Sequence, residues 1–286
     1  MNAQKIKKSD HIKPTIKTSR VEGIPFYIFL SSIAFILISL VIIYLVDLRN
    51  LWGIRDILYS WDERSIPFIN TRPFIFNHLY CNRGIAEIFQ WFFLGGAALT
   101  SMFISGLVYN HNRIMFLFWA IMSVAFTLML IEDAGDPRHT ISTYFALLFN
   151  SSLVSKMVEG VYFTILASIP IYALLKYRKP IMADTRTSRY LITGFTGYAT
   201  AAIFSFSGDF VFYTWAGGKI RSAMLLISDD QTAVQWSIYD KEQGWPIINY
   251  FLMDSMVEES IELIAAAAFC ASAVAFLLHV RRKYGL

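Results

Sequence analysis

Four carboxylates stand close together near the end of the chain, within residues 254–262. The segments on both sides of this stretch are apolar, so the sequence predicts one helix of membrane-spanning length that carries its acids inside the span. At about 100° per residue, Asp254, Glu258 and Glu262 lie along one face of that helix, and Glu259 lies beside them. Ionised side chains at membrane depth rarely face lipid, so this face must meet other helices, water, protons or a metal ion.

A second polar group lies at the predicted end of an earlier helix, in residues 132–139. His139 follows Asp136 by three residues, which places both on one side of a helical turn. Hard oxygen ligands suit Mg, Ca or Mn, and an added imidazole admits Zn or Fe. A solvated loop at a helix end explains this group equally well, because neither H-E-x-x-H nor E-x-x-H spacing is present.

Carboxylates as close as Glu258 and Glu262 cannot all ionise without a compensating cation. Protons, a metal ion, or Arg and His side chains would supply it. We predict a divalent metal site of unknown metal identity, with Glu259 or Glu159 as a general base on metal-bound water. The predicted metal ligands are Glu132, Asp133, His139, Glu258 and Glu262. The other members of the predicted polar cluster are Glu87, Asp136, Asp209 and Asp254.

The composition is that of a polytopic membrane protein, because 56% of the 286 residues are hydrophobic and 16% are charged. Its two cysteines, Cys81 and Cys270, form no C-x-x-C motif, so they indicate neither a disulfide framework nor a cysteine metal site. Motifs of serine hydrolases, nucleotide-driven pumps and c-type haem proteins are absent from the sequence. We therefore expect an all-α bundle of about six transmembrane helices.

The chain begins with a basic tail, 1–23, and the bundle occupies 24–286. Two polar loops, 47–83 and 217–245, are expected to cap one end of it. The predicted spans are 24–46, 84–109, 114–131, 155–175, 190–215 and 247–279.

This division places both termini on one side. The tail, the 176–189 loop and the C-terminus then hold more than half of the 25 Lys and Arg residues on that side, which the positive-inside rule makes cytoplasmic. The acids within the spans, and those at the end of the span 114–131, fall at the opposite end, although neighbouring spans run in opposite directions. Random placement would scatter these acids, so their convergence indicates a site.

Small residues recur every fourth position in three spans, which favours close helix packing. The stripes are Thr193, Gly197, Ala201, Ser205 and Asp209; Ala97, Ser101 and Ser105; and Ala267, Ala271 and Ala275. The first stripe ends on Asp209, so Asp209 is predicted to face the bundle.

The motifs 133–139 and 258–262 together resemble a loose group of bacterial multi-pass membrane proteins of unassigned function. In that group, an acidic helix end followed by a histidine precedes a late helix carrying Glu-Glu-x-x-Glu. This sequence has Asp-Pro-Arg-His where a Glu usually follows the His. The resemblance covers two short motifs and implies no activity.

We expect an integral protein of a bacterial inner membrane that binds a divalent metal and acts as a metal-dependent enzyme on a lipid or other membrane-soluble substrate. The alternatives are a cation- or proton-coupled transporter, and a non-catalytic subunit whose acids pair with partner residues in a larger membrane complex. The lipid bilayer is the expected environment, and nothing in the sequence favours nucleic acid as a partner.

Overall fold

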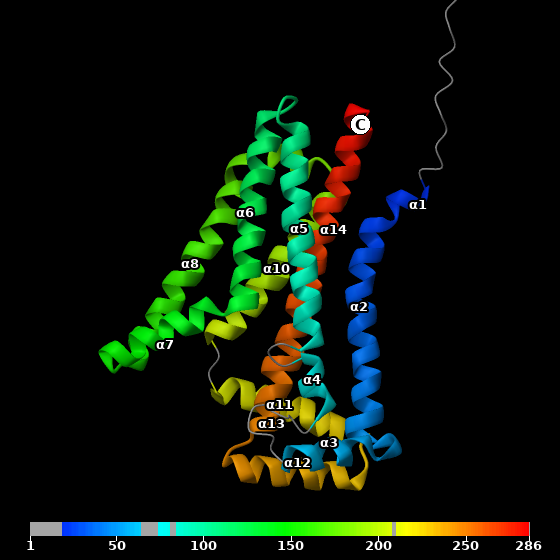
Figure 1. Cartoon of the computed structure of the whole chain (residues 1–286), viewed down its shortest axis with the longest axis vertical. Helices are drawn as coiled ribbons and strands as arrows, with labels where there is room; N and C mark the ends of the chain where they lie inside the picture. The colour runs from blue at the N-terminus through cyan, green and yellow to red at the C-terminus, as the bar shows by residue number, and fades with distance from the viewer. Residues whose placement is uncertain (1–18, 64–73, 81–83, 208–209, 286) are drawn as a thin grey trace, which may run out of the picture.

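The structure is a computed structural model that describes residues 19–63, 74–80, 84–207 and 210–285, and these ranges contain no strand. The chain is all-α, as predicted (Figure 1). Its α-helices are α1 (Ser19–Glu22), α2 (Ile24–Ile43), α3 (Ile54–Glu63), α4 (Ile75–Tyr80), α5 (Ile85–Val108), α6 (Arg113–Gly135), α7 (Pro137–Phe149), α8 (Ser152–Tyr177), α9 (Lys179–Met182), α10 (Thr185–Ser207), α11 (Phe210–Leu225), α12 (Asp230–Gln243), α13 (Ile247–Phe251) and α14 (Glu259–Tyr284). A 3₁₀ turn spans Leu51–Gly53, and π-helical segments span Tyr44–Leu48 and Leu252–Glu258.

Five stretches are long and apolar enough to cross a membrane, by length and composition. This is the profile of a polytopic membrane protein, but it does not reproduce the six predicted spans. The difference lies in the predicted span 190–215, where α10 ends at Ser207 and α11 begins at Phe210. The five stretches lie within Ile24–Leu48, Ile75–Val108, Arg113–Gly135, Leu153–Tyr177 and Ile247–Tyr284.

Helix α14 is the centre of the bundle, because it packs against α2, α5 and α10 (Figure 1). Its alanine run from Ala265 to Ala268 is fully buried. Small side chains let the neighbouring backbones approach closely, and this close packing replaces the hydrophobic driving force that is missing inside a membrane.

Glycines set the contact between α10 and α14. A Cβ on Gly197 would lie 2.8 Å from the Ala265 Cβ, and one on Gly194 would lie 2.5 Å from the Phe269 ring. Thr193, which the predicted stripe included, is exposed. The contact face of α10 therefore runs through Gly194 and Gly197, one position away from the start of the predicted stripe.

The end of the bundle opposite the C-terminus is covered by α3, α11, α12 and α13, which together we call the cap (Figure 1). The predicted polar loops 47–83 and 217–245 are therefore largely helical where the structure describes them. The predicted loop 217–245 begins at Gly217, yet Gly217 and Gly218 both lie inside α11. A Cβ on Gly217 would overlap the main-chain oxygen of Asn249, so glycine at this position lets α11 press against α13.

The basic segments meet at the other end of the bundle. Arg282 lies 3.1 Å from the Glu22 carboxylate, and Arg186 donates to the Glu22 main-chain oxygen at 2.9 Å. His279 lies 3.6 Å from Asp184. These contacts hold the first described residues, the start of α10 and the end of α14 together, so the bundle has one basic end.

Candidate functional site

The acidic stretch that opens α14 is not a regular α-helix. Residues Leu252–Glu258 form a π-helix, and α14 begins at Glu259. The wider π turn rotates Asp254 and Glu258 relative to Glu262 compared with the single α-helical face predicted from the sequence. Single π turns inside α-helices occur frequently at functional sites.

Glu258 is buried with 8% exposure, and its carboxylate accepts a hydrogen bond from the Tyr213 hydroxyl of α11. Asp254 contacts the Tyr250 hydroxyl one turn earlier. Both acids therefore have neutral phenol partners. Sequence reasoning missed Tyr213, although it stands four residues after Asp209, where continuing the small-residue stripe by one step would have found it.

Four further acids from three helices form the centre of the site, which we call the bundle cluster. They are Glu87 of α5, Asp133 of α6, and Glu259 and Glu262 of α14. Each carboxylate lies within electrostatic range of the others. All four side chains are half-buried. The bundle cluster therefore concentrates like charge between helices that are far apart in the sequence.

The amide of Gln90 is the direct partner of Glu259. Its Nε2 donates to Glu259 Oε2 at 2.7 Å and to the Glu259 main-chain oxygen at 3.0 Å. Gln90 is fully buried. The amide ties α5 to the start of α14 through a neutral contact and leaves the negative charge of the cluster unchanged.

Arg138 brings a positive charge to this region from the first turn of α7. Its Nε lies 3.3 Å from Glu132 Oε1, its Nη1 donates to Ser205 Oγ at 3.1 Å, and its guanidinium carbon lies 4.5 Å from the centre of the Phe163 ring. The same guanidinium is within electrostatic range of Asp254, Glu258 and Glu262. One arginine thus serves several carboxylates.

His139 forms the exposed margin of the site. Its Nδ1 lies 3.6 Å from Glu159 Oε1, and its Nε2 lies 4.0 Å from Asp136 Oδ1. Ser142 Oγ donates to Glu159 Oε1 at 2.9 Å, so the hydroxyl contacts the carboxylate and not the imidazole. The histidine is 55% exposed. This arrangement is not a serine–histidine–acid triad, because a triad needs the hydroxyl against the imidazole.

The predicted metal ligands do not converge on one point. Glu132 contacts Arg138, His139 faces Glu159, and Glu258 bonds Tyr213, while Asp133 and Glu262 belong to the bundle cluster. Within the described ranges, no group of three or more His, Cys, Asp and Glu side chains is placed to hold one metal ion. Asp209 lies outside the described residues. Of the two predicted general bases, Glu259 is in the bundle cluster and Glu159 is at its exposed margin.

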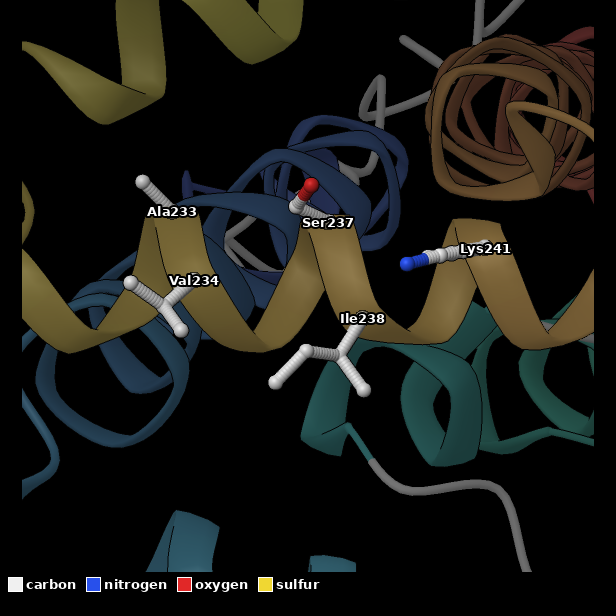
Figure 2. A pocket seen from close by; sticks show the side chains of 5 residues that line it. All are labelled: Ala233, Val234, Ser237, Ile238 and Lys241. Carbon is white, nitrogen blue, oxygen red and sulfur yellow. The ribbon is translucent and has the colours of Figure 1, made fainter.

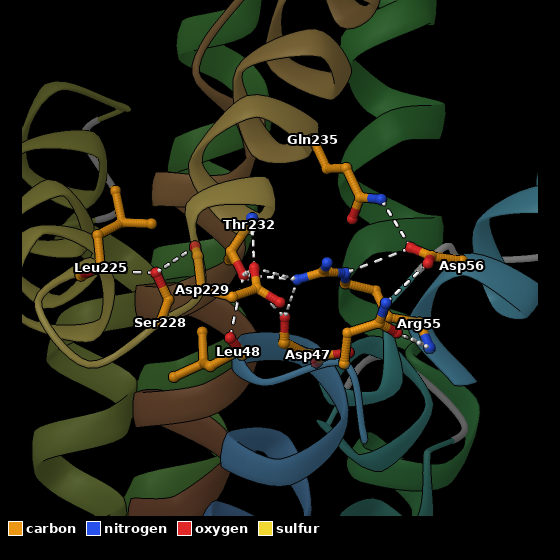
Figure 3. Close-up of polar contacts among 10 residues, drawn as sticks. Asp47, Leu48, Arg55, Asp56, Leu225, Ser228, Asp229, Thr232 and Gln235 are labelled. Atoms are coloured by element: carbon orange, nitrogen blue, oxygen red, sulfur yellow. Dashed lines mark hydrogen bonds and ion pairs between the residues drawn. The ribbon is translucent and has the colours of Figure 1, made fainter. Parts of the chain in front are cut away.

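A second buried polar group, which we call the cap lock, joins the end of α2 to the cap (Figure 3). The Asp47 carboxylate accepts the main-chain N–H groups of Ile75 and Phe76 at 2.9 and 3.0 Å. The Arg55 guanidinium, 1% exposed, donates to the Asp47 main-chain oxygen and to Asp229 Oδ1, each at 3.0 Å.

Asp229 begins α12, and its carboxylate also accepts the Thr232 N–H at 2.8 Å. Burial acts to raise the pKa of Asp229, but the hydrogen bonds from Arg55 and Thr232 outweigh burial and hold that pKa below its usual value. Asp229 is therefore held in its ionised form.

Outside these two groups, the surface of α12 carries a hollow that is lined by α12 alone (Figure 2). Its lining residues are Ala233, Val234, Ser237, Ile238 and Lys241. No second element faces them across the hollow, so it is an open helix face and offers no set of convergent polar groups.

Comparison with known proteins assigns no relative. No protein family, no curated protein sequence and no solved structure matches this chain.

Proposed function

We propose that this protein is a membrane transporter that exchanges protons for a cation at the bundle cluster. The observation that carries the proposal is the concentration of like charge: four acids from three helices lie within electrostatic range of one another, and one of them, Glu259, accepts a hydrogen bond from the neutral amide of Gln90. Carboxylates in this setting must bind protons or another cation, since like charges in a low dielectric repel strongly. A group that binds either one is suited to exchange them.

Access to the cluster supports this function. The four carboxylates are half-buried. Toward the basic end, α6 and α14 meet through a packed aromatic layer in which Trp119, Phe126, Phe269 and Phe276 are fully buried. The Phe126 and Phe269 rings lie 4.8 Å apart, and those of Trp119 and Phe276 lie 5.0 Å apart.

A site closed on one side is one of the two states that alternating access requires. We propose that the structure represents the transporter state in which the bundle cluster is accessible from the cap end and closed toward the basic end. The π-helical turn at Leu252–Glu258 departs from regular α-helix beside the site. Such turns occur frequently at functional sites.

The orientation follows from charge. We propose that the basic end, with both chain termini, faces the cytoplasm and that the cap faces outward from a bacterial inner membrane. A reporter fused after Leu286 should then behave as cytoplasmic, and one inserted between Asp229 and Asp230 should behave as exported. The reverse pattern would overturn this orientation.

Purified protein in liposomes that contain a pH-sensitive dye tests the exchange. Outward gradients of sodium, potassium, magnesium, calcium and an organic ammonium chloride would be imposed one at a time, with electrical potentials clamped. We expect at least one gradient to move protons, and we expect Glu259→Gln combined with Glu262→Gln to abolish the movement. If no gradient produces a dye response above that of empty liposomes, the exchange function is wrong.

A metal-dependent enzyme acting on a membrane-soluble substrate is the second candidate. The observation that favours it is the half-exposed imidazole of His139 between Glu159 and Asp136, within reach of a substrate in the bilayer. Divalent metal at stoichiometric level in the purified protein, lost in His139→Ala, would support the enzyme. Metal at background level would rule out the metal-dependent enzyme and would leave the proposed exchange function unaffected.

A further inference from the structure

Three oxygens beside the bundle cluster are buried and have no hydrogen-bond partner among the residues that the structure describes. They are Gln90 Oε1, Asp133 Oδ2 and Tyr198 Oη. The orientation of the Gln90 amide is not arbitrary, because its nitrogen donates to a main-chain carbonyl of Glu259, which only a donor can satisfy. The amide oxygen is therefore an acceptor in a fully buried side chain.

The residues that carry the three oxygens come from α5, α6 and α10 and have Glu259 as a neighbour. The Gln90 amide donates a hydrogen bond to the Glu259 carboxylate. Asp133 and Tyr198 are each within electrostatic range of Glu259 and Glu262, and of each other. Glu259 is thus the common neighbour of all three oxygens.

Leaving a buried polar group unpaired costs about 1–3 kcal/mol, so three such groups beside Glu259 indicate a ligand. All three oxygens can accept a hydrogen bond. The amide oxygen of Gln90 can never donate one, and the carboxylate oxygen of Asp133 cannot donate one while the acid is ionised. The ligand must therefore present positive charge or donor hydrogens to several oxygens at once.

The charge of the ligand is limited by the number of carboxylates that can contact it directly. Divalent ions are held by several carboxylates at about 2.0–2.6 Å. No group of three or more acidic, His or Cys side chains in the described part of the chain is placed in that way. Neutral amide and phenol oxygens complete the set, which suits a singly charged ion.

We propose that Gln90, Asp133 and Tyr198 bind an alkali cation, Na⁺ or K⁺, whose charge is balanced by the neighbouring Glu259 and Glu262. Because it supplies the cation of the proposed exchange, this site rests on that proposed function. Protonation of the acids would release the alkali cation, and its binding would release protons.

Thermal unfolding of the detergent-solubilised full chain tests the site, with NaCl, KCl, choline chloride and MgCl₂ compared at equal ionic strength. A saturating alkali chloride should raise Tm by roughly 5–10 °C above choline chloride, the size expected for a ligand at about 100 times its Kd and a chain of this length. Equal Tm in alkali and choline chloride, or a larger rise with MgCl₂, would overturn the proposal.

Tyr198→Phe is the informative variant, because the hydroxyl of Tyr198 has no hydrogen-bond partner in the described part of the chain, and its removal leaves every described hydrogen bond intact. It should keep the Tm in choline chloride and shift the alkali response to at least tenfold higher salt. Ser101→Ala is the matched control, since Ser101 Oγ is also buried and unpaired but lies further along α5. If Tyr198→Phe and Ser101→Ala respond alike, the site is wrong.

The outcomes separate this site from the exchange function. An alkali-specific Tm rise without dye response in liposomes would support the site and contradict transport. Proton movement driven only by magnesium, calcium or the organic ammonium ion, without an alkali effect on Tm, would support transport and contradict the alkali site.

Discussion

The cap lock and the bundle cluster both bury carboxylates, but Asp229 in the cap lock has a guanidinium as its partner, whereas Glu259 in the bundle cluster has a neutral amide. Arg55 reaches Asp229 and the main-chain oxygen of Asp47, while two N–H groups hold the Asp47 carboxylate. In the bundle cluster, the Gln90 amide donates to Glu259, and Glu262 is within electrostatic range of the Arg138 guanidinium.

This difference separates a structural site from an exchangeable one. A buried ion pair is strongly destabilised only when one of its partners is removed. A group of like-charged acids depends on the protons or cations that its surroundings supply. Removing charge should therefore damage the cap lock and relieve the bundle cluster.

The largest effect is expected at Arg55. Arg55→Ala removes the buried guanidinium that donates to Asp229 and to the Asp47 main-chain oxygen, and loss of one partner from a buried pair costs about 3–5 kcal/mol. The free energy of unfolding in detergent measures the loss. Arg49→Ala is the control, because Arg49 is exposed in the same segment and should change stability by less than about 0.5 kcal/mol. Equal losses in the two variants would mean that Arg55 is not part of a lock.

The opposite sign is expected in the bundle cluster. Glu262→Gln removes one of several like charges while it keeps nearly the same shape, so stability in choline chloride should stay equal or rise by about 1 kcal/mol. Chemical unfolding in choline chloride and in NaCl provides the measurement. A loss as large as that of Arg55→Ala would show that Glu262 is matched by a fixed partner and that the comparison fails.

Sequence patterns predicted the helical architecture and singled out the acids of the bundle cluster. The free-energy cost of burying charge in a membrane makes each acid inside a predicted span conspicuous. Ala97 and Ser101, predicted to pack, are both fully buried. The helices of the cap could not be predicted, because Gly217 looks like a helix end unless Asn249 is known to press against it.

The site itself was predicted only as a set of residues. The sequence does not show that a π-helical turn rotates Asp254 and Glu258, or that Tyr213 is the partner of Glu258. The neutral partners, Gln90 and Tyr198, have no charge to mark them, and their importance follows from oxygens whose burial only a structure reveals.

A smaller effect is expected from pH at the cap lock. The folded pKa of Asp229 is lowered below the unfolded value of about 3.9, so its contribution is complete above that pH and is lost as pH falls through the folded pKa. Asp229 is 30% exposed, which limits the contribution to about 1 kcal/mol. The stability difference between wild type and Asp229→Asn should shrink below about pH 4, measured by thermal unfolding. If the stability difference between wild type and Asp229→Asn grew on acidification, the pKa of Asp229 in the folded protein would not be lowered.

The smallest effect is expected at the exposed margin. Asp136 is 51% exposed and 4.0 Å from His139, so Asp136→Asn should change the free energy of unfolding by less than about 0.5 kcal/mol. Its alkali response should equal that of wild type, because Asp136 is outside the bundle cluster. A shifted alkali response would extend the cluster to the margin.

Proton release on cation binding tests the central claim most directly. A pH indicator in weakly buffered detergent solution would follow the purified protein as NaCl, KCl or choline chloride is added. We expect sodium or potassium to release protons, choline to release none, and Glu259→Gln combined with Glu262→Gln to abolish the release. If neither alkali cation releases more protons than choline does, the bundle cluster does not exchange protons for an alkali cation.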